Sequence, residues 1–280
     1  MEESLNEIEN IILTGNEGFI GKNIEKRLIQ SGYNVICFEK DSTPHEISKV
    51  MTANSVLVHQ GAITDTLYED DIEMMKNNYE FSRELFDYSI NKGIKVVYAS
   101  SAASYGTDGY PINIYGWSKY CAEQYGIALY KRAEKTRKQF IALRYFNVFG
   151  SGEEDKGRMS SVAYQAMKKG KMKLFPKEPR RDFVYVQDIV NANIHAIESQ
   201  PHEIRTGYYD VGSGEASTFE EVCKHLDIPY TYTSESEIPK GYQFFTKSSE
   251  DKWMPNWKPK YNLETALKEY KEMIGVSNED

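Results

Sequence analysis

A tyrosine and a lysine, Tyr115 and Lys119, stand four residues apart where the pattern predicts a helix over 115–135. Four residues make about one helical turn, so the two side chains share one face. A lysine ammonium beside a phenol favours the phenolate, which lets a tyrosine with an ordinary pKa of about 10 act as a base near neutral pH. The spacing alone is weak, because the chain has 21 tyrosines and Tyr164 and Lys168 share it.

The position of the first pair in the chain favours it over the second. A predicted strand over 95–99 leads into Ser100 and Ser101. Open α/β sheets bind ligands at the carboxyl ends of their strands. There the Ser101 hydroxyl can share the reacting oxygen of a substrate with Tyr115. The order of these groups predicts a hydride-transfer site built from Ser101, Tyr115 and Lys119.

A glycine-rich turn precedes these groups. The first predicted strand, 11–14, runs into Gly15-Asn16-Glu17-Gly18-Phe19-Ile20-Gly21, and a helix over 18–30 begins inside that run. Glycines at this spacing permit a tight turn, close approach of a pyrophosphate and close helix packing. The main-chain N–H groups at the helix start can bind the anion. The run predicts a dinucleotide-binding turn.

The next strand, 35–38, ends at Glu39 and Lys40. An acidic residue about 20 residues after the glycine turn hydrogen-bonds the ribose hydroxyls and repels a 2′-phosphate. Glu39 therefore favours NAD. Lys40 could instead pair with a 2′-phosphate, so NADP stays open.

Apolar runs alternate with helical patterns, which is the signature of a parallel sheet. Further strands are predicted over 56–59, 95–99 and 140–143, with a helix over 68–91. We predict an α/β protein with a Rossmann-type doubly wound parallel sheet and a small C-terminal lobe. The expected parts are an acidic leader over 1–10, an NAD(P)-binding domain over 11–155 to which 186–212 returns, and a substrate-binding lobe over 156–185 and 213–280.

The composition of the 280 residues is that of a folded protein, with 40% hydrophobic and 27% charged positions. No run approaches the roughly 18 apolar residues of a membrane helix, and the acidic start does not read as a signal peptide. The net charge of −8 argues against nucleic-acid binding. The three cysteines have no metal-ligand spacing, so no metal site is predicted. We expect a cytoplasmic protein.

Several motifs resemble the extended short-chain dehydrogenase/reductase family and, within it, the ADP-L-glycero-D-manno-heptose 6-epimerases. They are His59-Gln60-Gly61-Ala62, Asn77-Asn78-Tyr79, the run over 98–106, Arg144-Tyr145-Phe146-Asn147-Val148-Phe149-Gly150, Asp155-Lys156-Gly157, Arg181-Asp182-Phe183-Val184-Tyr185-Val186 and Lys240-Gly241-Tyr242-Gln243. The resemblance covers nearly the whole chain from Ile11. It implies a homo-oligomeric nucleotide-sugar epimerase with tightly bound NAD or NADP.

The resemblance also implies roles for particular residues. Tyr115 and Lys156 would be two bases on opposite faces of C6 of a heptose, with Ser101 and Lys119 supporting Tyr115. The cofactor would be held by Gly15, Glu17, Gly18, Phe19, Ile20, Gly21, Glu39, Lys40, Gln60, Gly61, Ala62, Asn78, Tyr115, Lys119 and Val148. The substrate would be held by Ser101, Asn147, Arg158, Gln165, Phe175, Arg181 and Tyr242.

The sequence departs from the family in four places, one of which is Asp210, where the family has asparagine. The segment between Glu39 and His59 is short, so the usual helix, third strand and helix are expected to be cut away. Arg158 stands where the family has serine, and Gln165 where it has histidine. These changes leave open another nucleotide-sugar epimerase or reductase, such as a 4-epimerase type or an enzyme for another nucleotide-linked heptose. A cofactor-binding sensor or scaffold without turnover is the alternative from another functional class.

Overall fold

The computed structural model describes residues 8–106, 109–133, 138–239 and 242–277. Most of the predicted acidic leader and the end of the predicted helix over 115–135 lie outside these ranges. The chain forms two compact units, which we describe separately. The first unit is Met1–Arg144 with Ala192–Tyr209, and the second is Tyr145–Asn191 with Asp210–Asp280.

The first unit alternates strands and helices, as predicted. Its elements are β1 (Asn10–Thr14), α1 (Phe19–Gln30), β2 (Val35–Phe38), α2 (Pro44–Ser48), β3 (Ser55–His59), α3 (Asp71–Met75), the π-helical turn η1 (Lys76–Glu80), α4 (Phe81–Asn91), β4 (Lys95–Ser101), the short 3₁₀ turn η2 (Ala102–Ser104), α5 (Ile114–Arg132) and β5 (Phe140–Tyr145). Two later elements, α7 (Val186–Glu198) and β10 (Gly207–Val211), each have residues in both units.

These strands form a six-stranded sheet in the order β10-β5-β4-β3-β1-β2. β1 pairs in parallel with β2 on one side and with β3 on the other, and β3 pairs in parallel with β4. The strand order therefore reverses at β1, which is where doubly wound sheets open a crevice at their carboxyl ends. The predicted α/β doubly wound sheet is confirmed.

The short segment between β2 and β3 changes one end of the sheet. It contains the five-residue helix α2, which begins with a capping box of Thr43 and Glu46, and then leads directly into β3. β2 is consequently the last strand on its side of β1. The predicted loss of a third strand beyond β2 is confirmed.

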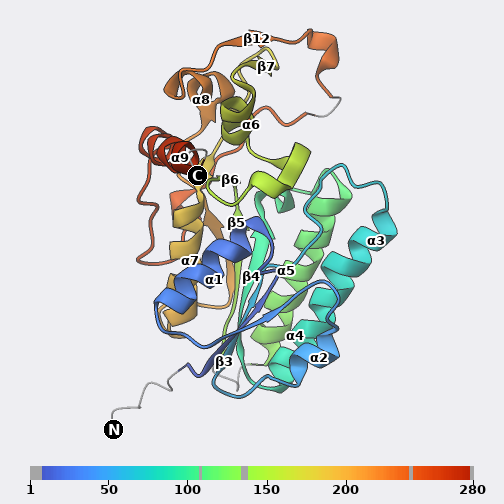
Figure 1. The fold of residues 1–280 in the computed structure, drawn as a ribbon. Helices are drawn as coiled ribbons and strands as arrows, with labels where there is room; N and C mark the ends of the chain where they lie inside the picture. The colour runs from blue at the N-terminus through green and yellow to red at the C-terminus, as the bar shows by residue number, and fades with distance from the viewer. Residues whose placement is uncertain (1–7, 107–108, 134–137, 240–241, 278–280) are drawn as a thin grey trace. The chain divides into compact units, whose positions relative to one another are not determined.

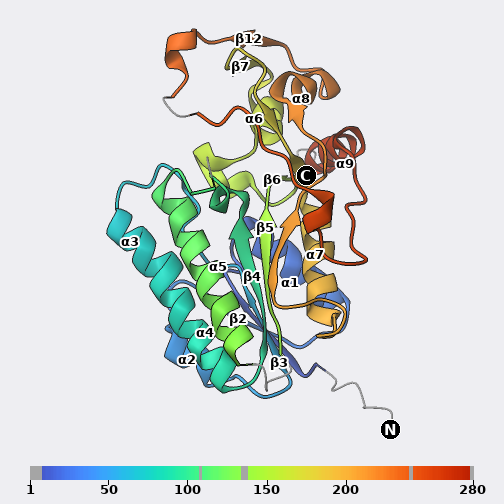
Figure 2. The same ribbon diagram turned by 180° about the vertical axis from the view of Figure 1, so that it is seen from behind.

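Helices cover both faces of the sheet. Figures 1 and 2 show α1 on one side, and α4 and α5 on the other. α1 contacts β1 and β2 through buried Ile24 and Leu28, while α4 and α5 contact β4 and each other. Between α4, α5 and the sheet lies an aromatic core in which the Phe140 ring centroid is 4.8 Å from that of Phe86 and 5.6 Å from that of Tyr130.

The predicted helix over 68–91 has a different form. It begins at Asp71, where Asp70 caps the first turn, and its middle is the π-helical turn η1. A π-helical turn has an additional residue, so the buried side of the helix is rotated relative to a regular α-helix. The turn carries Asn78, which is 1% exposed.

The second unit has shorter elements. They are β6 (Asn147–Phe149), the 3₁₀ segment η4 (Glu154–Met159), α6 (Val162–Lys169), β7 (Met172–Leu174), β8 (Arg180–Arg181), β9 (Phe183–Tyr185), β11 (Ser217–Thr218), α8 (Phe219–His225), β12 (Tyr230–Tyr232), the 3₁₀ turns η5 (Glu235–Glu237) and η6 (Glu250–Lys252), and α9 (Leu263–Ser277). Three two-stranded sheets pair β6 with β9, β7 with β12, and β8 with β11. None of the helices over the described residues is long and apolar enough to cross a bilayer.

We predict that Phe140→Ala lowers the free energy of unfolding by about 3–5 kcal/mol, because the change leaves a cavity among packed rings. Chemical denaturation of the full chain measures the loss. The matched control is Ile72→Ala, since Ile72 is 83% exposed and its truncation should cost less than about 0.5 kcal/mol. Equal losses in the two variants would contradict this account of the core.

Candidate active site

The glycine turn after β1 forms a tight cradle. Gly15 has a φ of +74°, and a Cβ added there would lie 2.7 Å from the Cα of Gly61. A Cβ on Gly21 would collide with the Gly15 carbonyl oxygen, so α1 packs directly against the turn. α1 begins after Gly18 with no side-chain cap, whereas α2, α5, α6 and α8 are all capped by side chains. An uncapped helix start presents main-chain N–H groups to an anion. The turn therefore fits the pyrophosphate of a dinucleotide.

Glu39, directly after β2, lies against this turn. Its Oε1 accepts a hydrogen bond of 2.8 Å from the main-chain N–H of Glu17. The neighbouring Lys40 is exposed. In the first turn of α1, Phe19 is buried and Ile20 is half-buried. The Glu39 carboxylate is thus held against the glycine turn, and its contact with a ribose stays a prediction.

The loop after β3 meets the glycine turn. The main-chain N–H of Gly61 donates to Thr14 Oγ1 at 3.2 Å, and Gln60 Nε2 donates to Asn193 Oδ1 at 3.2 Å. Ala62 follows, half-buried. Because β1 and β3 are parallel neighbours, the loops that follow them reach the same edge of the sheet. Two of the predicted cofactor segments thus come together at the point where the strand order reverses.

A buried histidine links this edge to the π-helical turn. His59, which is 1% exposed, contacts Thr14 Oγ1 through Nδ1 at 2.7 Å and Ser82 Oγ through Nε2 at 2.8 Å. Burial, and to a smaller degree the nearby Lys119, lower the pKa of His59 to about 3. The ring is therefore neutral at physiological pH and serves as a hydrogen-bond bridge.

The amide of Asn78 continues the same network. Its Oδ1 accepts from the Ile63 N–H at 2.8 Å, and its Nδ2 donates to the Ile63 carbonyl at 2.9 Å and to Ser118 Oγ at 3.1 Å. Ser118 Oγ in turn donates to the Tyr115 carbonyl at 2.8 Å. Both ends of the amide are bonded inside the protein. This favours a positioning role for Asn78, between the loop after β3 and helix α5, over the direct cofactor contact that the sequence predicted.

Helix α5 carries the predicted acid–base pair. Asn113 caps its start by accepting from the Gly116 N–H at 2.8 Å, so Tyr115 lies in the first turn and Lys119 one turn later. Lys119 is 3% exposed, and its Nζ lies 4.8 Å from the centroid of the Tyr98 ring. Burial lowers the pKa of Lys119 to about 7. The helix places the two groups on one face, as the spacing predicted.

The predicted effect of Lys119 on the phenol stays a prediction, because burial has the larger influence on the pKa of Tyr115. Burial raises the pKa of Tyr115 above its usual value, and a hydrogen bond with the Ser101 side chain offsets part of that rise. The sequence could not show how deeply the phenol is buried. In this state Tyr115 is a proton donor at neutral pH. Its use as a base requires an added positive charge nearby.

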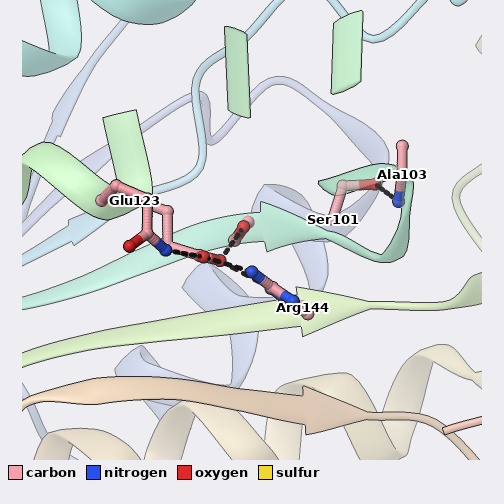
Figure 3. A network of polar contacts seen from close by, with 6 residues as sticks. Ser101, Ala103, Glu123 and Arg144 are labelled. Carbon is pink, nitrogen blue, oxygen red and sulfur yellow. Dashed lines mark hydrogen bonds and ion pairs between the residues drawn. The ribbon is translucent and has the colours of Figure 1, made fainter. Parts of the chain in front are cut away.

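A buried ion pair between Glu123 and Arg144, which was not predicted from the sequence, connects the elements of this site (Figure 3). Glu123, which is 0% exposed, accepts from Arg144 Nε at 2.9 Å and from Arg144 Nη2 at 2.5 Å. It also accepts from Ser100 Oγ at 2.6 Å. The Arg144 guanidinium carbon lies 4.2 Å from the ring centroid of Tyr105 and 3.8 Å from that of Tyr208.

The ion pair connects three elements of the site. Glu123 is on α5, Ser100 is on β4 beside Ser101, and Arg144 is on β5. Tyr115, Lys119 and Glu123 follow one another at four-residue steps, so this spacing was a signal from which Glu123 could have been found.

The predicted substrate residues of the second unit gather around Arg181. This arginine is 9% exposed, and its guanidinium carbon lies 5.0 Å from the centroid of the Tyr242 ring, which meets the Phe175 ring edge-on at 5.2 Å. The neighbouring Asp182 is buried and accepts from the main-chain N–H groups of Ser213 at 2.6 Å and Ser248 at 2.9 Å. A guanidinium beside aromatic rings is suited to a phosphate and a base.

The other predicted residues of this unit differ in their surroundings. Lys156 lies in η4 and is half-buried; burial lowers the pKa of its amine, while the Glu153 carboxylate raises it. Asn147 and Arg158 are exposed, and Val148 pairs with Val184 between β6 and β9.

Gln165 is bonded within its own surroundings. Its Nε2 donates to the Ser160 carbonyl at 2.9 Å, and its Oε1 accepts from Lys169 Nζ at 3.0 Å. Each end of the amide keeps one further hydrogen-bonding position, so Gln165 can also contact a substrate.

The family of the chain follows from its sequence match. The profile described as the NAD dependent epimerase/dehydratase family matches residues 11–212, which is more than half of the chain. The chain belongs to this family. Membership confirms the predicted Rossmann-type fold and the predicted NAD(P)-dependent enzyme of the extended short-chain dehydrogenase/reductase type.

Relatives of this NAD-dependent epimerase/dehydratase confirm the narrower resemblance. The ADP-L-glycero-D-manno-heptose-6-epimerase of Brachyspira hyodysenteriae is 33% identical in an alignment 316 positions long, which covers 95% of this chain and 98% of that protein. The Pseudomonas aeruginosa protein of the same name is 36% identical over 257 residues, 76% of each chain. The crystal structure of the Helicobacter pylori ADP-L-glycero-D-manno-heptose-6-epimerase superposes with a TM-score of 0.81 at 26% identity, covering 97% of both chains.

We predict that Glu123→Gln lowers the free energy of unfolding of this epimerase/dehydratase by about 3–5 kcal/mol, because it leaves the buried Arg144 charge without its counter-ion. Adding Arg144→Met should restore part of the loss, since the two changes act on one interaction. Chemical denaturation measures both variants. The exposed pair Arg83–Asp87, at 3.7 Å, is the control, and Arg83→Met should cost less than about 1 kcal/mol. Strict additivity of the Glu123 and Arg144 changes would contradict the coupling.

Proposed function

We propose that the protein epimerises C6 of an ADP-linked glyceromanno-heptose, by transient oxidation and re-reduction with bound NAD. The observation that carries the proposal is the placement of Tyr115 and Lys119 on one face of α5, with Ser101 bonded to the phenol. The substrate class is supported by the relatives from Brachyspira hyodysenteriae and Pseudomonas aeruginosa, whose names state this activity.

The glycine turn and the residues around it would hold the cofactor. The uncapped start of α1 would bind the pyrophosphate, and Glu39, which lies beside this turn, would accept hydrogen bonds from the ribose hydroxyls, which favours NAD over NADP. When bound, the oxidised nicotinamide supplies a hydride acceptor and a positive charge. A positive charge beside the buried phenol lowers the pKa of Tyr115, which is the condition for Tyr115 to act as a base.

The proton chemistry would need two groups. Removal of the hydrogen at C6 as hydride, together with the hydroxyl proton, leaves a planar carbonyl carbon. If the side chain of the sugar rotates, the hydride returns to the other face, and a proton must be returned to the oxygen in its new position. Tyr115 would serve one configuration, with Ser101 sharing the reacting oxygen, and Lys156 would serve the other. Burial lowers the pKa of the Lys156 amine, which brings it closer to the working pH of a base.

The second unit would hold the rest of the substrate. Arg181 would bind the diphosphate, Tyr242 and Phe175 would flank the nucleoside, and Asn147 would contact the sugar. Arg158 and Gln165 would set the sugar preference. The homo-oligomer and the cytoplasmic location stay predictions.

The alternatives differ in what they require of these residues. Another nucleotide-sugar epimerase or reductase would use Ser101, Tyr115 and Lys119 in the same way, but with a different sugar beside Arg158 and Gln165. A sensor or scaffold has no use for a phenol hydrogen-bonded to a serine at the sheet edge, so the geometry of α5 favours an enzyme.

Proton NMR of ADP-D-glycero-β-D-manno-heptose incubated with the purified protein tests the proposal. The reaction is run without added cofactor, with NAD and with NADP. Formation of the L-glycero epimer supports the proposed function, and the three conditions identify which cofactor is used and whether it is retained. No conversion in any condition contradicts it, and conversion of GDP-heptose instead would move the assignment to another nucleotide.

We predict that Tyr115→Phe lowers kcat by about 10²–10⁴-fold, the usual contribution of a general acid–base group. The steady-state epimerisation rate measures this loss. Tyr120→Phe is the matched control, because Tyr120 lies on the same helix and packs against Trp117 instead. Turnover of Tyr115→Phe within tenfold of the parent protein would show that Tyr115 does not transfer the proton.

We predict that Glu39→Ala weakens NAD binding by about tenfold or more, because the ribose loses a charged hydrogen-bond acceptor. Isothermal titration calorimetry of the cofactor-free protein measures the change for NAD and for NADP. The affinity for NADP should fall less, or rise, since the repulsion of a 2′-phosphate is removed. Unchanged NAD affinity would mean that the carboxylate does not contact the ribose.

A further inference from the structure

Glu153 is a buried carboxylate of the second unit to which no part of the reaction has so far been assigned. It is 0% exposed and stands directly before η4. Its Oε1 accepts from the Gly150 main-chain N–H at 3.1 Å, from Ser161 Oγ at 2.7 Å and from the Tyr270 hydroxyl at 3.1 Å. Its Oε2 accepts from the Ser161 main-chain N–H. Four donors therefore converge on one buried anion.

These donors stand at both ends of the loop that carries Lys156. Gly150 precedes the loop and Ser161 caps helix α6 after it, while Tyr270 ties the carboxylate to α9. Inside the loop, the Lys156 main-chain N–H donates to the Glu153 carbonyl at 3.1 Å, and Gly157 has a φ of +54°. One side chain therefore bonds both ends of the loop. A reactive group that is already held in place loses less conformational entropy when it reaches the geometry for reaction.

We propose that Glu153 is the positioning residue of Lys156: its buried carboxylate bonds both ends of the loop that carries this lysine. This inference rests on the proposed function, in which Lys156 is the second acid–base group. It assigns no contact between Glu153 and the substrate.

The electrostatics of the segment agree with this geometry. Burial alone would push the pKa of Lys156 down, and the Glu153 carboxylate acts in the opposite direction. Glu154, Asp155 and Arg158 are the other charged groups of the segment, and all three are exposed. From the elements packed nearby, Tyr270 of α9 is a titratable group that donates to the carboxylate, and Tyr164 of α6 and Glu154 in turn act on Tyr270. Loss of the Glu153 charge therefore leaves the Lys156 amine easier to deprotonate.

The test measures the titration of Lys156 directly. Lysine amines of the full chain are labelled by reductive ¹³C-methylation, and the Lys156 resonance is assigned by its absence in Lys156→Met. We expect this resonance to titrate at lower pH in Glu153→Gln than in the parent protein. Tyr270→Phe is the control, since it removes one hydrogen bond and no charge, and should leave the titration unchanged.

In the unlabelled protein, the kcat of Glu153→Gln should fall by about 10²-fold, because the amine is displaced.

The outcomes separate this inference from the proposed function. Loss of turnover in Lys156→Met, with an unmoved Lys156 resonance and normal kcat in Glu153→Gln, overturns the role of Glu153 alone. Normal turnover in Lys156→Met overturns the two-base proposal itself. If Glu153→Gln does not fold, Glu153→Asp keeps the charge but shortens its reach. It should lower kcat while the resonance stays near its parent position, and an unchanged kcat would count against positioning.

Discussion

The buried pair of Glu123 and Arg144 is the interaction on which the rest of the first unit's site depends. Two buried charges are stable only when the hydrogen-bond donors and acceptors of both groups have partners. Here Glu123 accepts hydrogen bonds from Arg144 and from the Ser100 hydroxyl, and the guanidinium lies against two tyrosine rings. These requirements allow few arrangements. They fix the ends of β4 and β5 against α5, and with them the place of Ser101 relative to Tyr115.

A second hydrogen-bond network fixes α5 against the ends of β1 and β3, where we propose that the cofactor binds. It runs from Thr14 through His59 and Ser82 to Asn78, and from Asn78 through Ser118 to the main chain of Tyr115. Because burial holds His59 neutral, the ring can connect two hydroxyls without placing another positive charge beside Lys119. Burial of Lys119 itself makes its amine easier to deprotonate than that of an exposed lysine. Both networks use polar groups in a dry interior, where an unsatisfied partner is costly.

The sequence predicted the elements whose signals are local. The strand into the glycine turn, the acidic residue after β2 and the helix that carries Tyr115 depend on periodicity and glycine spacing, and the structure has all of them. The shortened segment before β3 could be predicted because it is a matter of length. The π-helical turn around Asn78 could not, because no local residue pattern in this segment signals the additional residue of such a turn.

The parts of the site that were not predicted depend on contacts between residues that lie far apart in the sequence. The partners Glu123 and Arg144 are 21 positions apart, and Glu153 meets Tyr270 across 117. The rise in the pKa of Tyr115 reflects burial, which the spacing of Tyr115 and Lys119 does not contain. The roles of Lys156, Arg181 and Tyr242 came from the resemblance to a family, and the contacts of each unit add the physical surroundings of those residues.

The central claim is that the hydrogen at C6 leaves as hydride to a bound cofactor and returns from it. Epimerisation of ADP-D-glycero-β-D-manno-heptose in D₂O tests this claim most directly. The account predicts an L-glycero product that carries ordinary hydrogen at C6, because the cofactor returns what it removed and solvent contributes only to the hydroxyl. Deuterium at C6 of the product would contradict the account, since it would show that the carbon is deprotonated and reprotonated by groups in exchange with water.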